Sequence, residues 1–214
     1  MTRGNDSGNH SSKAALRQAL LRARSGLTAD ERQEAERAVG ARAMSLPELA
    51  EAAVVAAYVS VGAEPGTREL IEALRLRGVR VLLPVLLPDN DLDWAEYAGR
   101  DSLAKASRGL LEPVGPRLGP DAVQEADAVL LPGLAVDERG VRLGRGGGSY
   151  DRVLERLDRA GHEVALVVVL YADEVVERVP AEPHDRRVTA AVTPHGIVRF
   201  AREPGERDRS GPRD

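Results

Sequence analysis

The chain has 214 residues, of which 43% are hydrophobic and 30% are charged, values that fit an ordinary globular protein and exclude a fibre, a wholly disordered chain or a membrane protein. Its 30 Lys and Arg residues against 34 Asp and Glu residues give a formal charge of -4, so no overall basic field is present to hold a nucleic acid. The absence of cysteine excludes disulfides, thiolate catalysis and sulfur-ligated metals.

The two ends of the chain are polar. Residues 1–12 are small and polar, and residues 201–214 alternate Arg with acidic residues, Gly and Pro, so neither end can bury enough apolar surface to offset its ordering entropy. We expect two disordered tails around one domain at residues 13–200. The start has no apolar leader, and no apolar run approaches the roughly 18 residues of a membrane helix. We therefore expect a cytoplasmic protein with no membrane or nucleic-acid partner.

The N-terminal part of the chain predicts two helices. Ser12 can cap a helix that begins at Lys13, in which an apolar stripe runs beside the cationic pair Lys13 and Arg17. Thr28 and Glu31 form the T-x-x-E pattern of a capping box, in which each side chain bonds the backbone of the other residue. This pattern opens the second predicted helix.

Strand and helix patterns alternate through the rest of the chain. Residues 53–61 form a continuous apolar run, which is typical of a strand buried on both faces, and Gly78 ends a helix predicted over residues 67–77. The remaining predicted elements are strands at residues 79–87, 92–97, 128–131, 163–170 and, as the last strand, 188–193, and a helix at residues 150–160. This rhythm predicts a single-domain three-layer α/β/α sandwich with a mainly parallel sheet, preceded by the two N-terminal helices. Such folds bind ligands at the carboxyl ends of their strands.

A glycine cluster lies between a predicted strand and a predicted helix, within residues 130–154. Glycine lets the backbone approach a ligand closely, and the amides of the cluster, with those at the start of the helix, make a nest for an anion. Arg142 and Arg145 add cations that can form paired bonds with phosphate oxygens. The glycines concerned are Gly144, Gly146, Gly147 and Gly148. We interpret the segment as a phosphate-binding loop, with a flexible connector as the structural alternative.

Two general nucleotide motifs do not fit this loop, whereas a more specific one does. No Lys-Ser or Lys-Thr follows Gly148, which excludes Walker A, and a dinucleotide fingerprint would require glycine at Ser149. Residues 132–137 (PGLAVD) and 142–152 (RLGRGGGSYDR) resemble the signature of the 5-formyltetrahydrofolate cyclo-ligase family, P-G-x-A-F-D followed by R-L-G-x-G-x-G-Y-Y-D-R.

Three shorter segments resemble the same family in the same order. Residues 13–17 (KAALR) resemble its N-terminal K-x-x-x-R helix, Glu64 resembles the acid of its E-x-x-T segment, and residues 183–185 (PHD) resemble its late E-H-D segment. The resemblance spans residues 13–193.

The resemblance implies an ATP-dependent ligase of one-carbon metabolism that converts 5-formyltetrahydrofolate to 5,10-methenyltetrahydrofolate. ATP phosphorylates the formyl oxygen, N10 of the folate attacks the activated carbon, and phosphate leaves, with ADP as the other product. The expected ligands are ATP, 5-formyltetrahydrofolate and Mg²⁺, and we expect a monomer.

The resemblance also implies roles for individual residues. The expected ATP-binding residues are Lys13, Arg17, Arg142, Gly144, Arg145, Gly146, Gly147, Gly148, Ser149 and Tyr150. The expected folate-binding residues are Val59, Glu64 and Tyr150, and the expected catalytic residues are Arg145 and Tyr150. Asp151 and Asp185 are expected to position Mg²⁺, directly or through water.

These roles have structural alternatives. Lys13 and Arg17 can form a solvated helix face, Asp151 can stabilise a helix N-terminus, Asp185 can form a surface ion pair, and Glu64 can shape a turn.

Two other functions also remain open. One is a non-catalytic folate- or nucleotide-binding protein of the same fold. The other is a sugar-phosphate or CoA-transferring enzyme with the same layers, although it gives no reason for the paired Lys13 and Arg17.

The sequence departs from the family pattern at three positions. Ser149 replaces the first Tyr of the Y-Y-D run, Val136 replaces the usual Phe, and Glu174 stands where many members carry Gln. We expect these departures to change pterin packing or affinity. We expect ATP binding to be retained, because none of them removes a phosphate or metal ligand.

Overall fold

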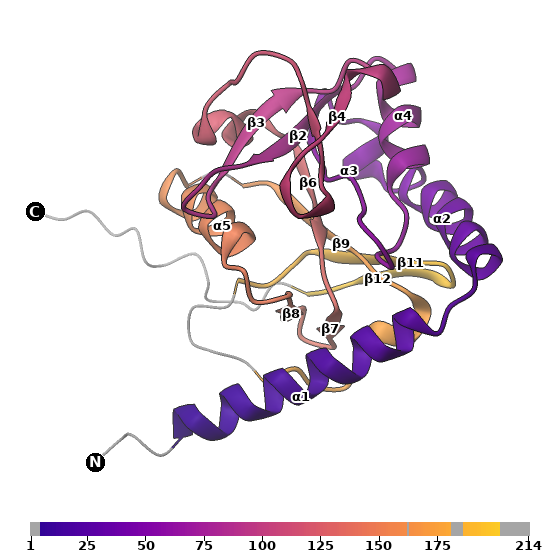
Figure 1. The fold of residues 1–214 in the computed structure, drawn as a ribbon, viewed down its shortest axis with the longest axis vertical. Helices are drawn as coiled ribbons and strands as arrows, with labels where there is room; N and C mark the ends of the chain where they lie inside the picture. Colours follow the sequence, from indigo (N-terminus) through magenta and orange to yellow (C-terminus); the bar gives the residue numbers. More distant parts are fainter. Residues whose placement is uncertain (1–4, 162, 181–185, 202–214) are drawn as a thin grey trace, which may run out of the picture.

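The computed structural model describes residues 5–161, 163–180 and 186–201, and its centre is a seven-stranded sheet in the order β12-β11-β9-β6-β1-β2-β3 (Figure 1). The five inner strands run parallel, whereas the edge strands β3 and β12 are antiparallel to their neighbours. The strands are β1 (Val54–Ala56), β2 (Arg80–Leu86), β3 (Leu92–Glu96), β6 (Ala128–Pro132), β9 (Ala165–Val169), β11 (Ala190–Thr193) and β12 (Gly196–Arg199). The mainly parallel sheet predicted from the sequence is confirmed.

Helices cover both faces of this sheet, and each layer has its own apolar core. On one face pack α2 (Ala29–Ala43), α3 (Pro47–Ala50) and α4 (Arg68–Leu76). On the other face pack α5 (Ser149–Arg159) and the 3-10 helix η3 (Pro120–Glu125). Side chains along β1 alternate between the layers, with Val55 toward α2 and α4 and Ala56 toward α5. The predicted three-layer sandwich is confirmed.

The N-terminal helix α1 (Asn5–Ser25) packs outside the main sheet, against a smaller sheet in the order β10-β7-β8. Figure 1 shows α1 along the edge of the molecule, next to β7 and β8. Leu16 and Leu20 pack against the apolar cluster of this sheet, so the predicted apolar stripe is the surface that docks the helix. The strands of the smaller sheet are β7 (Ala135–Asp137), β8 (Arg142–Leu143) and β10 (Val175–Val176).

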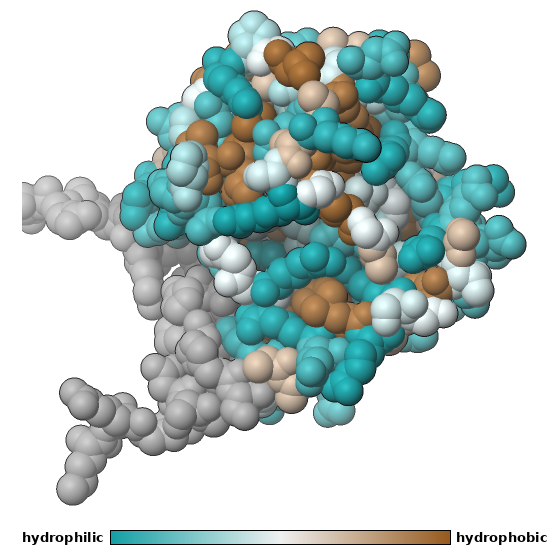
Figure 2. All heavy atoms as spheres, viewed as in Figure 1, coloured by the Kyte–Doolittle hydropathy of each residue, from teal (hydrophilic) through white to brown (hydrophobic). Residues whose placement is uncertain are grey.

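The remaining elements are short. A two-stranded ribbon and three 3-10 helices complete the described chain: β4 (Leu103–Lys105), β5 (Leu111–Pro113), η1 (Arg100–Ser102), η2 (Ser107–Gly109) and η4 (Ala172–Glu174). In the view of Figure 2, hydrophilic side chains predominate on the surface and apolar atoms show between them. None of the helices in the described ranges combines the length and the apolar character that a membrane crossing requires.

Local sequence signals placed the second helix correctly. The hydroxyl of Thr28 accepts a hydrogen bond from the Glu31 amide at 3.2 Å, and the Glu31 carboxylate accepts one from the Thr28 amide at 2.7 Å. The predicted capping box is thus confirmed. The first helix begins at Asn5 rather than Lys13, so Ser12 lies inside it and residues 5–12 are helical instead of a tail. No proline interrupts this stretch, and a formed helix gains one hydrogen bond for each residue that it adds.

Two strand predictions are also corrected. Residues 188–193 do not form the last strand, because a turn at Pro194 and His195 reverses the chain into β12, which pairs antiparallel with β11. The run at residues 53–61 is paired as a strand only over Val54–Ala56. Beyond it the chain stays buried but leaves the ladder, and this departure starts the loop that carries Glu64.

Candidate functional site

The carboxyl ends of β1, β6 and β9 lie at one edge of the sheet, because these neighbouring strands are parallel. Three segments leave the sheet there, at residues 57–66, 133–148 and 170–174; the second includes the β7–β8 hairpin and ends in the glycine loop. The candidate site is built from these segments, the adjacent helix α1 and the start of α5.

Helix α1 contacts the glycine loop directly. The Nε atom of Arg17 donates to the carbonyl oxygen of Gly144 at 2.9 Å, and a Cβ built on Gly146 would lie 3.5 Å from the Arg17 guanidinium carbon. Lys13 lies one turn earlier on the same helix face and is only 7% exposed. A solvated helix face, the alternative for this pair, does not describe Lys13. The structure brings Arg17 of the first helix to the glycine loop.

The glycine loop has an open side and two residues in the left-handed region of the backbone. Gly146 and Gly148 have φ values of 91° and 77°, which favour glycine, and Gly148 is the N-cap of α5 without a side-chain cap. A Cβ on Gly147 or Gly148 would meet nothing within 4 Å. The loop therefore presents unhindered backbone next to the N-terminus of an 11-residue helix, which suits a phosphate group.

Arg142 connects the strand before the loop to the helix after it. Its Nη1 donates to the carbonyl oxygen of Pro132 at 3.0 Å and its Nη2 donates to Asp151 at 2.9 Å, and the Arg142 side chain is 7% exposed. Through these contacts, Arg142 holds the two ends of the glycine-loop segment together. The Asp151 side chain remains 67% exposed beside that pair. Asp185, the second expected Mg²⁺ residue, lies outside the described residues, and within them no group of three or more His, Cys, Asp or Glu residues could hold a metal ion.

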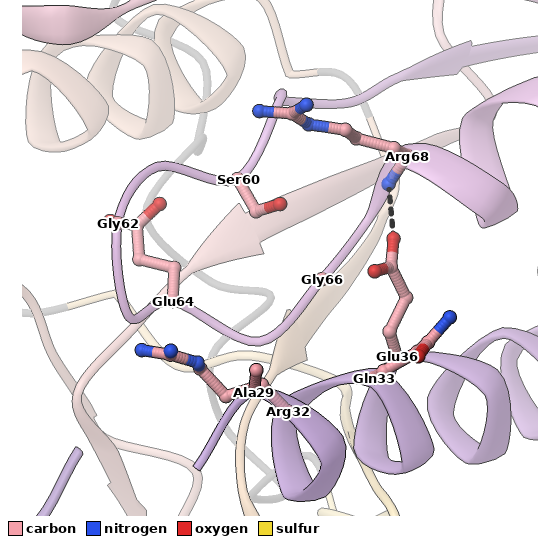
Figure 3. A pocket seen from close by; sticks show the side chains of 9 residues that line it. All are labelled: Ala29, Arg32, Gln33, Glu36, Ser60, Gly62, Glu64, Gly66 and Arg68. Atoms are coloured by element: carbon pink, nitrogen blue, oxygen red, sulfur yellow. Dashed lines mark hydrogen bonds between the residues drawn. The ribbon is translucent and has the colours of Figure 1, made fainter. Parts of the chain in front are cut away.

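Glu64 lies between the glycine loop and a cavity of about 280 Å³. Its carboxylate accepts a hydrogen bond from the Val61 amide at 2.9 Å and lies 3.3 Å from Nε of Arg145. The first contact shapes the turn, as the structural alternative predicted, and the second joins the turn to the glycine loop. Figure 3 shows the cavity between α2 and the loop at residues 57–66, which carries Glu64. Its lining residues are Ala29, Arg32, Gln33, Glu36, Ser60, Gly62, Glu64, Gly66 and Arg68.

The wall of this cavity is held in place by Glu36 of α2. Its carboxylate accepts hydrogen bonds from the amides of Arg68 at 3.1 Å and Glu69 at 3.3 Å, the first of which is drawn in Figure 3. A Cβ on Gly66 would overlap the Glu36 side chain. A side chain at residue 66 would therefore displace the Glu36 carboxylate from the amides that it binds.

Tyr150 opens α5 with its hydroxyl buried. This hydroxyl has no hydrogen-bond partner among the described residues. Burial raises the pKa of Tyr150, and the nearby Glu64 carboxylate raises it further. Tyr150 is thus a neutral group beside the glycine loop and within electrostatic reach of Glu64.

Of three other positions singled out in the sequence, two lie in the core and one lies at the site. Val59 is 7% exposed and packs in the apolar cluster shared with α2 and α4, so its side chain belongs to the core. Val136 is fully buried in β7, and its replacement of Phe therefore changes core packing. Ser149 is the first residue of α5 and is partly exposed next to Tyr150, which leaves it at the site.

An ion pair that the sequence analysis did not predict lies beneath the site. Arg24 donates to Glu174 from Nε at 2.6 Å and from Nη2 at 2.8 Å, and Nη2 also donates to the carbonyl oxygen of Gly133 at 2.6 Å. Glu174 further accepts from the Tyr171 amide at 2.8 Å. One signal was available: Arg24 follows Arg17 by seven residues and falls on the same helix face.

The fold and the site together define a class of protein. An α/β sandwich with a glycine loop and a cavity that carries a carboxylate, both at the carboxyl ends of its strands, belongs to the class of α/β proteins whose ligand sites lie at this edge of the sheet.

Comparisons with known proteins identify the family. The model of the 5-formyltetrahydrofolate cyclo-ligase family matches residues 9–194, and the chain belongs to this family. It is 44% identical over 150 residues to the 5-formyltetrahydrofolate cyclo-ligase of Mycolicibacterium smegmatis, a match that covers 67% of this chain and 75% of the relative. It is 33% identical over 176 residues to that of Escherichia coli K12, covering 81% and 96% of the two chains.

Solved structures agree with this assignment. The 5,10-methenyltetrahydrofolate synthetase of Aquifex aeolicus superposes with a TM-score of 0.75 at 29% identity, covering 93% of this chain and 99% of that one. The synthetase of Mycoplasma pneumoniae, at 19% identity and a TM-score of 0.66, shares the fold. The family resemblance drawn from the glycine-loop motif is confirmed.

Proposed function

We propose that this protein is an ATP-dependent ligase that closes 5-formyltetrahydrofolate to 5,10-methenyltetrahydrofolate, releasing ADP and phosphate. Membership of the cyclo-ligase family supports the reaction. The structural observation that carries the proposal is the 3.3 Å contact between Arg145 and Glu64, because it places a phosphate-loop cation beside the carboxylate of the neighbouring cavity.

The two ligands would bind on the two sides of that contact. On the ATP side, Arg17 and Lys13 on α1, Arg145 and the loop amides would hold phosphate oxygens and stabilise charge on the transferring phosphoryl group. On the folate side, Glu64 would accept hydrogen bonds from the N–H groups of the pterin ring. The formyl oxygen of the folate would then face the terminal phosphate of ATP across Arg145.

The chemistry needs an oxygen that is a good leaving group. The formyl oxygen attacks the terminal phosphorus of ATP and the bond from that phosphorus to ADP breaks. N10 then adds to the formyl carbon, the bond between this carbon and the phosphorylated oxygen breaks to release phosphate, and N10 loses its proton. Tyr150, neutral and buried beside the loop, is placed to orient the reacting groups, whereas Arg145 balances the negative charge on phosphate.

We further propose Asp151 as a ligand of Mg²⁺, together with Asp185. Asp151 fits such a role because it stands at the start of α5, next to the loop, with a carboxylate that is 67% exposed. Mg²⁺ keeps several waters and takes one or two carboxylates plus substrate phosphates. When bound, the ion would neutralise phosphate charge.

The reaction can be tested with purified protein, 5-formyltetrahydrofolate and Mg²⁺. The methenyl product has its own absorbance band, and we expect this band to grow only when ATP is present. Binding of the folate with no product in the presence of ATP would instead support the non-catalytic alternative. We also propose a monomer; a dimer mass in sedimentation equilibrium would contradict this.

A further inference from the structure

The hydroxyl of Tyr58 is a buried polar group without a partner. Tyr58 follows β1, its side chain is among the buried residues at 4% exposed, and its Oη has no hydrogen-bond partner in the described part of the chain. Leaving a buried hydroxyl unsatisfied costs about 1–3 kcal/mol. A protein rarely leaves such a group in its core without a use, and a group at the ligand-binding edge of the sheet has an evident one.

The strand alternation decides which way Tyr58 faces. Val55, Ala57 and Val59 all belong to the cluster on the α2 and α4 face, whereas Ala56 belongs to the cluster on the α5 face. Tyr58 continues the phase of Ala56, so its side chain lies on the side of α5 and the glycine loop. Val59, which the family resemblance assigned to the folate, is thus the core-facing neighbour of a residue on the α5 side of the sheet.

Glu64 lies near this hydroxyl. After burial, the Glu64 carboxylate is the strongest influence that raises the pKa of Tyr58, and it acts in the same way on Tyr150. Both tyrosines therefore stay protonated and can donate a hydrogen bond. The buried Arg24 guanidinium acts in the opposite direction and lowers the pKa of Tyr58, and its Nη1 is a second donor without a partner among the described residues.

The pterin ring of a folate matches this arrangement of one carboxylate and adjacent donors. Its 2-amino group and N3–H are neighbouring donors, and the 4-oxo group next to them is an acceptor. If Glu64 accepts from the two N–H groups, a donor is required beside it for the 4-oxo oxygen. We propose that the Tyr58 hydroxyl donates to the pterin 4-oxo oxygen and is a specificity-determining residue for the folate; this inference rests on the proposed function.

Tyr58→Phe tests the inference, because it removes one oxygen and leaves the ring in place. We expect the KM for 5-formyltetrahydrofolate to rise about tenfold, the loss of one hydrogen bond, while the KM for ATP stays within twofold. The melting temperature should be unchanged or higher, because the substitution removes an unsatisfied buried hydroxyl. Tyr97→Phe is the matched control: its hydroxyl donates to Glu72 of α4 at 2.9 Å, away from the glycine loop, so both KM values should be retained.

Calorimetric binding of 5-formyltetrahydrofolate without ATP separates this inference from the proposed reaction. A tenfold weaker Kd in Tyr58→Phe supports the contact even if the wild-type protein fails to make product, an outcome that would reject only the cyclo-ligase function. Unchanged folate affinity and KM in Tyr58→Phe would overturn the inference, since a bound water would then satisfy the hydroxyl. A rise in the KM for ATP alone would overturn it too.

Discussion

Arg24 and Glu174, which are 150 residues apart in the chain, form a buried ion pair with two hydrogen bonds, at 2.6 Å and 2.8 Å. Their side chains are 1% and 6% exposed. The pair joins α1 to the segment after β9, and the bond from Arg24 to the Gly133 carbonyl oxygen adds the segment after β6. Arg17, on the same helix, then bonds Gly144 at the other end of the β7–β8 hairpin. The helix that carries the ATP-side cations is thus held at both ends of one hairpin.

Removing one partner of this pair should destabilise the protein. Glu174→Ala leaves the Arg24 charge buried without its counter-ion, and we expect the free energy of unfolding to fall by about 3–5 kcal/mol in urea denaturation. Glu177→Ala, an exposed acid three residues later, should change it by less than about 0.5 kcal/mol.

Glu174→Gln tests whether the pair also positions α1. Glutamine keeps the size of the side chain and an acceptor for Arg24, and it is the residue that many family members carry. We expect a folded protein whose KM for ATP rises several-fold while folate affinity is retained. A merely structural role would lower the melting temperature and leave the KM for ATP unchanged.

Arg145 should be needed for turnover and not for folding. Its side chain is 53% exposed, and Arg145→Ala removes a cation from the proposed site of phosphoryl transfer. We expect kcat to fall by about 10²–10³, with an unchanged melting curve. Arg159→Ala, which removes an exposed cation at the far end of α5, is the control and should keep wild-type kcat. Wild-type turnover in Arg145→Ala would exclude the residue from the site.

The acid stability of the protein should depend on Asp137 at the tip of the β7–β8 hairpin. Burial opposes ionisation of this carboxyl, but hydrogen bonds from the Arg139 side chain and from the Val141 and Val179 amides lower its pKa below the ordinary value. Because the pKa is lower in the folded protein, Asp137 contributes stability above the unfolded pKa of about 3.9, and this is lost as the pH falls through the folded pKa.

Asp137→Asn should therefore melt at a lower temperature than wild type at neutral pH. The difference between the two proteins should shrink as the pH is lowered below about 4. A difference that is constant from pH 7 to pH 3 would show that Asp137 acts by its shape and not by its charge.

The glycine loop offers a matched pair of substitutions. Gly148 has a φ of 77°, whereas Gly147 is not in the left-handed region, and a Cβ on either residue would meet nothing within 4 Å. Gly148→Ala should lower the unfolding free energy by about 1–2 kcal/mol through backbone strain. Gly147→Ala should leave it unchanged in the absence of ATP. Equal melting temperatures for the two variants would contradict this prediction, because they would show that the backbone at residue 148 changes its conformation without cost.

Local rules determined much of this protein from its sequence. The Thr28–Glu31 capping box, the buried strands and the order of the layers follow from contacts between residues close in the chain and from the side-chain periods of helices and strands. The glycine-loop motif was long enough to indicate the family, because the chemistry of phosphate binding is concentrated in one continuous segment.

Only the tertiary structure decided how distant segments meet. The Arg24–Glu174 pair and the contact between Arg145 and Glu64 join segments that are far apart in the chain, and nothing in the local sequence says which cation meets which acid. The placement of Tyr58 on the α5 side of the sheet, and of Val59 in the core on the α2 side, depends on how β1 sits between its two layers. Burial and long-range pairing are properties of the packed chain, because each side chain's partner is set by the elements that pack against it.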